Sequence, residues 1–75
     1  MFNYVICNIE DDDVFYSQCK SLENNIPNII KGNFIEADIL QQEYFLNNKK
    51  IIVLNDWVTG VTINSEIDLK PFFKK

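Results

Sequence analysis

The spacing of apolar positions predicts a strand followed by a helix in the first third of the chain. Residues 2–9 read FNYVICNI and carry β-branched or aromatic residues on both faces, which predicts a central strand. An acidic run follows, and the next apolar residues recur at helical spacing on one side: Val14, Phe15, Cys19 and Leu22. The pattern predicts a helix over 12–25, capped by an Asp of the acidic run and ended before Pro27.

The middle of the chain combines a turn signal with an ambiguous segment. Gly32-Asn33 stands between two apolar runs and predicts a tight hairpin turn between strands at 28–31 and 34–39. Residues 38–48 contain good helix formers, and Asp38 followed by Gln41 resembles a capping box. A short helix is therefore expected over 38–48, with an irregular turn as the alternative, because its apolar positions do not line one helical face.

The last third predicts two more strands. Residues 51–54 form a short apolar run, and Asn55-Asp56 has the composition of a turn. Trp57 begins a second strand over 57–63 in which alternate residues share one face. The remaining residues, which include Pro71, are expected to form a short helix or an extended arm.

These elements together predict an α+β fold. One main helix packs on a small, mostly antiparallel sheet in a two-layer arrangement, because a sheet this small is marginal when neither face is covered. With 75 residues the chain fits one domain, residues 1–75, whose core is thin.

Composition narrows the function classes. The net charge is −4, the seven basic residues are all Lys, and His is absent. The lack of Arg and the acidic balance argue against nucleic acid and against an anionic membrane surface as partners. Without His, no Ser-His-Asp or Cys-His catalytic arrangement exists, so no enzyme activity is expected. No cofactor is expected either, because the two glycines cannot form a Gly-rich phosphate loop.

Cysteine usage and the N-terminal residues favour a cytoplasmic location. Cys7 and Cys19 do not form a CxxC pair, and we expect two free thiols, with a single bridge between them as the alternative. The first residues lack a basic start and turn acidic within ten positions, unlike a secretory signal.

The acidic run has three interpretations. Asp11, Asp12 and Asp13 fit an N-cap and a first helical turn that matches the helix dipole. Clustered carboxylates also suit a divalent cation, although the spacing lacks the Gly and Glu of an EF-hand loop. The same acids can meet a basic partner, which an N-cap role does not exclude.

Aromatic residues are more numerous than a thin core needs, at 13% of the chain. Phe15 and Tyr16 are neighbours on the predicted helix, so both cannot point inward. Since interfaces are enriched in aromatic residues, we expect an exposed patch. Its candidate members are Tyr16, Tyr44, Trp57 and Phe73.

The sequence thus predicts a small acidic module that binds another protein with a basic surface and occludes it, as an inhibitor or immunity protein does. The candidate contact residues are the three aspartates and the four aromatics named above. The first alternative is a homo-oligomeric accessory protein, for instance a homodimer that pairs its own apolar patch. The second is a carboxylate-based binder of a divalent metal.

Overall fold

The computed structural model describes residues 1–73, and of Phe73 only the backbone. Within these residues five strands and two helices follow one another: β1 (Phe2–Cys7), α1 (Asp12–Asn25), β2 (Ile30–Glu36), β3 (Leu40–Leu46), β4 (Lys49–Asp56), β5 (Gly60–Ser65) and α2 (Lys70–Phe73). The predicted α+β class is confirmed.

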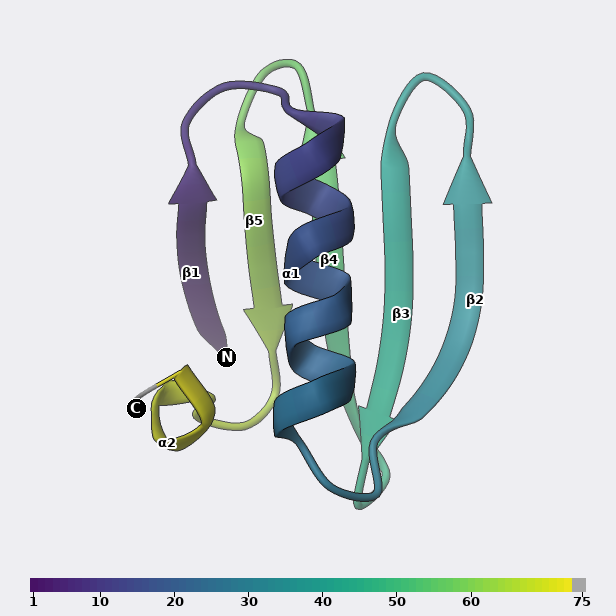
Figure 1. Cartoon of the computed structure of the whole chain (residues 1–75), viewed down its shortest axis with the longest axis vertical. Helices are drawn as coiled ribbons and strands as arrows, with labels where there is room; N and C mark the ends of the chain where they lie inside the picture. Colours follow the sequence, from purple (N-terminus) through teal and green to yellow (C-terminus); the bar gives the residue numbers. More distant parts are fainter. Residues whose placement is uncertain (74–75) are drawn as a thin grey trace.

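The strands form a single sheet in the order β1-β5-β4-β3-β2, and every neighbouring pair is antiparallel. Strands β2 to β5 are consecutive neighbours, whereas α1 connects β1 at one edge of the sheet to β2 at the other. In Figure 1 this helix lies across one face of the sheet. The prediction that β1 is central was wrong, because β1 pairs only with β5 and forms an edge.

Helix α1 has the bounds that local signals predicted. The Asp11 carboxylate accepts a 3.1 Å hydrogen bond from the Val14 backbone N–H and serves as the N-cap. Asp12 and Asp13 occupy the first turn, where they complement the helix dipole. The helix ends when Ile26 adopts an extended conformation before Pro27.

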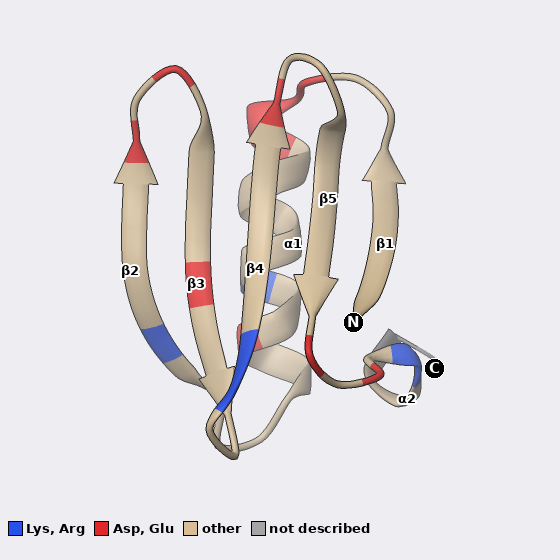
Figure 2. Ribbon diagram, turned by 180° about the vertical axis from the view of Figure 1, so that it is seen from behind, with Lys and Arg blue, Asp and Glu red and all other residues tan. Residues whose placement is uncertain are grey.

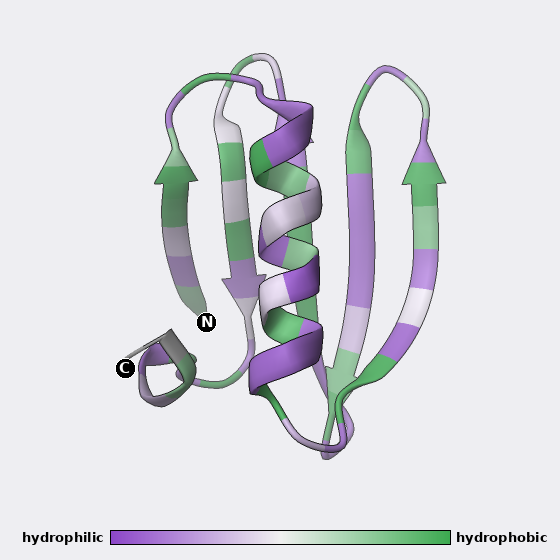
Figure 3. Ribbon diagram, in the orientation of Figure 1, coloured by the Kyte–Doolittle hydropathy of each residue, from purple (hydrophilic) through white to green (hydrophobic). Residues whose placement is uncertain are grey.

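The core lies between α1 and the sheet. From the helix, Phe15, Cys19 and Leu22 are buried against inward-facing side chains of the strands. The main inward-facing strand residues are Leu40, Tyr44, Leu46, Ile51, Val53, Val61 and Ile63. They alternate with outward-facing positions, as strand geometry requires, and Figure 3 shows this alternation along β5.

The segment 38–48 is strand β3 followed by a turn, so the predicted helix was wrong. Leu40, Gln42, Tyr44 and Leu46 all face the core in the burial pattern of the strand. Asn47 and Asn48 have φ angles of 53° and 65°. Consecutive positive φ values in a two-residue connection are typical of a type I′ hairpin turn, which Asn tolerates well.

Gly32 and Asn33 lie inside β2 and do not form the predicted hairpin turn. The pairing of β2 with β3 shifts between Lys31 and Phe34, which marks a bulge at these two residues. The buried Gln42 side chain stabilises the bulge, because its Nε2 donates to Gly32 O at 3.2 Å and lies 3.3 Å from Asn33 O. The real β2–β3 connection follows Glu36.

Asn55 and Asp56 belong to β4, and the turn predicted there occupies residues 57–59 instead. Trp57 is therefore a turn residue and not part of a strand. Gly60 opens β5 with a φ of 79°, and a Cβ at this position would lie 2.1 Å from the Cys7 carbonyl oxygen. Because β1 approaches so closely, only glycine fits here.

The chain after β5 includes the short helix α2, one of the two predicted forms of the tail. The Tyr4 hydroxyl donates a 2.8 Å hydrogen bond to Asp68 and accepts a 2.8 Å bond from the Leu69 N–H. These contacts fasten the tail beside β1 and bury Leu69. Cys7 and Cys19 are both free thiols, as expected. Neither α1 nor α2 is long and apolar enough to cross a membrane.

Candidate protein-binding surface

Three connections meet at one end of the molecule: β1–α1, β2–β3 and β4–β5 (Figure 1). Seven of the eleven acidic residues lie there, and we call this surface the acidic end. Its acids are Glu10, Asp11, Asp12, Asp13, Glu36, Asp38 and Asp56. Figure 2 shows these acids in red in two groups, at the β2–β3 connection and around the start of α1 and the end of β4, with the blue lysines of the strands and of α1 placed away from both.

Large apolar side chains are exposed among these acids. Trp57 and Val58, in the β4–β5 turn, are 73% and 67% exposed, and Ile9, in the β1–α1 connection, is 62% exposed. The turn itself is ordered by Asp56, whose carboxylate accepts a 3.0 Å hydrogen bond from the Val58 N–H. The acidic end therefore combines apolar contact area with negative charge.

Tyr16 lies one helical turn further along α1, with an exposed ring packed edge-on against Phe15 at a centroid distance of 5.1 Å. Partial burial raises the pKa of the Tyr16 hydroxyl, and the nearby charges of Glu36 and Asp12 raise it further. Tyr16 follows Asp12 by one turn of α1 and therefore borders the acidic end.

Two of the three predicted contact aspartates also hold the fold together. The Asp11 backbone N–H donates to Asn55 Oδ1 at 3.1 Å, and Asn55 Nδ2 donates to Asp12 Oδ1 at 2.8 Å. Asp11 is half-buried, whereas Asp12 and Asp13 are exposed. The carboxylates of Asp12 and Asp13 are thus presented to solvent from a fixed helix start.

Tyr44 was wrongly predicted to be exposed. Its ring is fully buried because position 44 of β3 faces α1. Its hydroxyl donates a 2.6 Å hydrogen bond to Glu23 Oε2 and lies 3.3 Å from the Cys19 carbonyl oxygen. Burial, followed by the bond to Glu23, raises the pKa of Tyr44 well above its ordinary value. The side chain of Phe73, the last predicted member, lies outside the described residues.

The structure therefore gathers Asp11, Asp12, Asp13 and Trp57 at one end, with Tyr16 beside them. Sequence reasoning missed the other contributors to this surface: Ile9, Glu10, Glu36, Asp38, Asp56 and Val58. Their only signal in the sequence is that each lies in or next to a strand connection. The fact that the three connections meet depends on the strand order, which no local pattern encodes.

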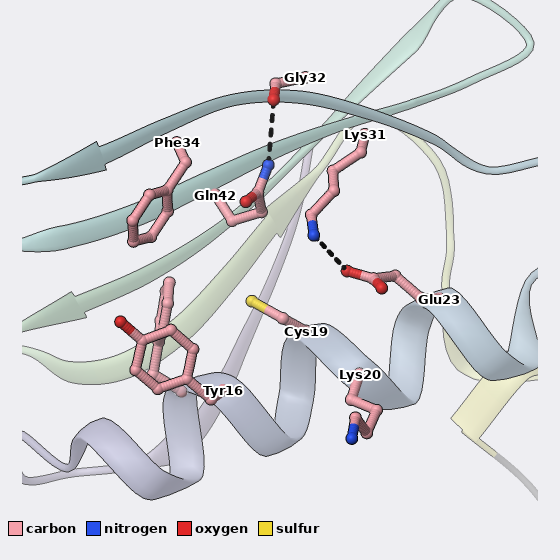
Figure 4. Close-up of a pocket in the computed structure, with 9 residues that line it drawn as sticks. Tyr16, Cys19, Lys20, Glu23, Lys31, Gly32, Phe34 and Gln42 are labelled. Carbon is pink, nitrogen blue, oxygen red and sulfur yellow. Dashed lines mark hydrogen bonds and ion pairs between the residues drawn. The ribbon is translucent and has the colours of Figure 1, made fainter.

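A groove of ≈ 500 Å³ lies between α1 and β2, beside the acidic end. Its walls are lined by Phe15, Tyr16, Cys19, Lys20, Glu23, Lys31, Gly32, Phe34 and Gln42. In Figure 4 the Phe34 ring and the Cys19 sulfur face the space between the helix and the sheet, whereas Lys20 points away. Phe34 and Phe15 lie with ring centroids 6.4 Å apart.

The far end of the groove is closed by a charge pair. Lys31 Nζ lies 3.4 Å from Glu23 Oε2, the same carboxylate oxygen that accepts from Tyr44 (Figure 4). Within the groove, burial raises the pKa of the Cys19 thiol, which keeps it protonated and poorly nucleophilic. The groove thus offers aromatic surface and no activated nucleophile at Cys19.

The sheet face opposite α1 is open. Val5, Ile30 and Ile35 are exposed on it, and Phe45, Ile52 and Leu54 are half-buried between them. Polar residues interrupt this surface, including the 3.5 Å ion pair between Lys50 and Glu43. This face is therefore a mixed surface with scattered apolar positions.

Among residues 1–73, no three His, Cys, Asp or Glu side chains are grouped so that they could hold a metal ion. A comparison with protein-family models, with curated proteins and with solved structures finds no match to this chain.

Proposed function

We propose that this protein is a small cytoplasmic binding module, of inhibitor or immunity type, whose acidic end docks on a basic surface of another protein and occludes it. The observation that carries the proposal is the position of Trp57, 73% exposed, at the end where seven of the eleven acids gather. Interface hot spots are enriched in Trp and Tyr, and complementary charge speeds and orients association.

The acidic end is well suited to recognition because it is held in place before a partner arrives. Asn55 ties the start of α1 to β4, and Asp56 orders the turn that carries Trp57. Fixed contact residues lose less conformational entropy on binding than mobile ones do. In this proposal α1 is the main helix of a two-layer scaffold that positions the acidic end.

The proposed role is not catalytic. The mechanism is steric: the partner's functional surface is covered, and its basic residues pair with exposed acids such as Asp12 and Asp13. Ion pairs between these carboxylates and basic residues at the rim of such an interface contribute mainly to the association rate and its salt dependence. The Trp57 side chain, once buried against the partner, contributes to the residence time of the complex.

The proposal is tested by capture from lysate of the source organism, with mass spectrometry to identify the bound protein. A stoichiometric basic partner should be lost from Trp57→Ala and weakened by Glu10→Gln combined with Asp13→Asn. Two matched controls lie elsewhere: Val5→Ala on the open sheet face, and Glu66→Gln, which removes the same kind of charge beyond β5. Loss of capture by the controls to the same extent would contradict a role for the acidic end.

A second candidate, self-association, is favoured by the open sheet face with exposed Val5, Ile30 and Ile35. Two copies that buried this face against each other would form a homodimer of the accessory type. Sedimentation equilibrium separates the candidates: a mass that rises with concentration and returns to that of the monomer with Val5→Lys supports the dimer. A constant monomer mass excludes it over the concentrations measured.

A further inference from the structure

We propose that the partner supplies an extended, basic segment that pairs with the free edge of β2, inserts one large apolar side chain into the α1–β2 groove, and directs a Lys or Arg toward the acidic end. This deepens the proposed function and rests on it for the basic character of the partner. Three features of the structure carry it: a free strand edge, an aromatic groove beside that edge, and carboxylates beyond one end of the groove.

The first feature is the free edge. Strand β2 has a hydrogen-bonded neighbour on one side only, β3. Alternate backbone N–H and C=O groups of such a strand point away from the sheet and can pair with another chain. The bulge at Gly32 and Asn33 interrupts this edge, so the regular stretch available for pairing is Phe34–Glu36, next to the acidic end.

The second feature is the position of the groove. Successive side chains of a strand alternate between the two sheet faces. A segment that extends the sheet beyond β2 therefore directs every second side chain toward the α1 side, where Phe34, Phe15 and Tyr16 form an aromatic surface. A volume of ≈ 500 Å³ is enough for one large apolar side chain and its neighbours. Backbone pairing gives affinity in this arrangement, and the groove gives selectivity.

The third feature is charge. The Lys31–Glu23 ion pair closes one end of the groove, and the two charges offset each other there. The other end is lined by Tyr16 and Phe34, and beyond it lie Glu36, at the end of β2, and Asp12, at the start of α1. Lys20 also lines the groove but points away from it in Figure 4, and no lysine of residues 1–73 lies at the acidic end itself. A cationic side chain that extends past Tyr16 toward the acidic end meets the carboxylates of Glu36 and Asp12.

The test uses a phage-displayed library of random twelve-residue peptides selected against the intact protein. Enriched peptides should share one large apolar residue with a Lys or Arg nearby. Synthetic copies should shift the backbone amide resonances of Phe34–Glu36 in NMR spectra. Methylation of the alternate backbone nitrogens that point toward β2 should reduce the affinity of the peptide at least tenfold.

Two positions of the same strand give a matched comparison. Phe34 faces the groove, whereas Ile30 pairs opposite Phe45 on the other sheet face and is more exposed, at 63% against 44%. Phe34→Ala should weaken peptide binding at least tenfold, and Ile30→Ala should leave it within about twofold, as expected for a residue outside the contact. Glu36→Gln should weaken the basic peptide but not a version whose Lys or Arg is replaced by norleucine.

Failure of this inference is distinguishable from failure of the proposed function. If no peptide is enriched, or if enriched peptides shift only resonances around Trp57, pairing at β2 is excluded while docking at the acidic end stands. If capture of a protein partner is insensitive to Trp57→Ala but peptides still pair with β2, the edge is supported and the proposed function fails. Concentration-dependent shifts of Ile30–Glu36 without peptide would identify a second copy as the occupant and overturn the proposal.

Discussion

The buried carboxamide of Asn55 donates a 2.8 Å hydrogen bond to the Asp12 carboxylate and joins β4 to the first turn of α1. The same side chain accepts a 3.1 Å bond from the Asp11 N–H, so one residue satisfies a helix-terminal donor and a carboxylate together. Asn55 is fully buried, and its position in the sheet determines where the acids of the helix start are held.

Replacement of Asn55 by Ala should lower the free energy of unfolding by about 2–3 kcal/mol. The change removes both bonds and leaves the Asp11 N–H without its partner in a partly buried site, which costs about 1–3 kcal/mol for each unsatisfied group. Asn64→Ala, on the outward side of β5, is the matched control and should change stability by less than about 1 kcal/mol. Urea unfolding measures both, and equal losses would contradict the role assigned to Asn55.

Tyr44→Phe should destabilise the fold by about 1–2 kcal/mol, because it removes a hydroxyl that joins the buried ring to the carboxylate of Glu23 at the edge of the core. The ring remains, so no cavity larger than one oxygen is created. Tyr16→Phe removes an exposed hydroxyl from the neighbouring helix face and should change stability by less than about 0.5 kcal/mol. Chemical unfolding of the two variants gives the comparison, and a neutral Tyr44→Phe would show that the Glu23 contact contributes nothing to stability.

The elements that the sequence predicted correctly are those with strong local signals. Helix α1 has a side-chain N-cap at Asp11 and a proline just after its end, and both act within a few residues. Strand β3 was missed because Gln42 faces the core and Phe45 faces outward, which obscures the alternation of polar and apolar positions. The inward position of Gln42 is explained by its hydrogen bonds to the carbonyls of Gly32 and Asn33 in the bulge, which lie ten and nine residues away in the sequence.

The candidate surface was predictable only in part for the same reason. Asp11 to Asp13 and Trp57 could be found by composition, but the pairing of Asn55 with the helix start depends on contacts 43 and 44 residues apart in sequence. Tyr44 was assigned to the surface because Tyr44 and Phe45 are adjacent aromatic residues, which cannot both point inward. The strand assignment places it in the core, since even-numbered positions of β3 face α1.

Gly60→Ala should be strongly destabilising, by at least about 2 kcal/mol. The residue has a φ of 79°, which costs a non-glycine residue about 1–3 kcal/mol, and the new Cβ would collide with the backbone of Cys7 and Asn8. Gly32→Ala is the matched control, because Gly32 has no positive φ and the nearest atoms to its Cβ would belong to side chains, the Glu43 carboxylate at 2.9 Å and the Phe45 ring at 3.0 Å. Thermal unfolding should rank Gly60→Ala well below Gly32→Ala; the reverse order would contradict the close approach of β1.

Replacement of Trp57 should affect partner binding but not the stability of the fold. Because its side chain is 73% exposed, Trp57→Ala should change the free energy of unfolding by no more than about 0.5 kcal/mol. The same change should weaken partner binding at least tenfold if Trp57 is the anchor of the interface. Thermal unfolding and the capture assay are read on the same preparation, so that lost binding with unchanged stability identifies a contact residue. Lost stability in the same variant would show that Trp57 supports the fold.

Stability should depend on pH through Asp68. The backbone N–H of Lys70 and the Tyr4 hydroxyl both donate to its carboxylate, and in that order they hold the pKa of Asp68 below its ordinary value. A carboxyl group whose pKa is lower in the folded state stabilises the fold above the unfolded-state pKa, which is about 3.9 for Asp. That stabilisation is lost as the pH falls through the folded-state pKa.

The wild-type protein should therefore unfold at a higher temperature than Asp68→Asn at pH 6, and the difference should shrink as the pH is lowered below about 4. Tyr4→Phe removes one of the two donors, so the pH-dependent part of its stability should be smaller than in the wild type. Melting curves recorded between pH 2 and pH 7 measure all three proteins. Parallel curves for the wild type and Asp68→Asn would show that the Asp68 charge does not fasten the tail to β1, and that Leu69 is held there by packing and the Tyr4 hydroxyl alone.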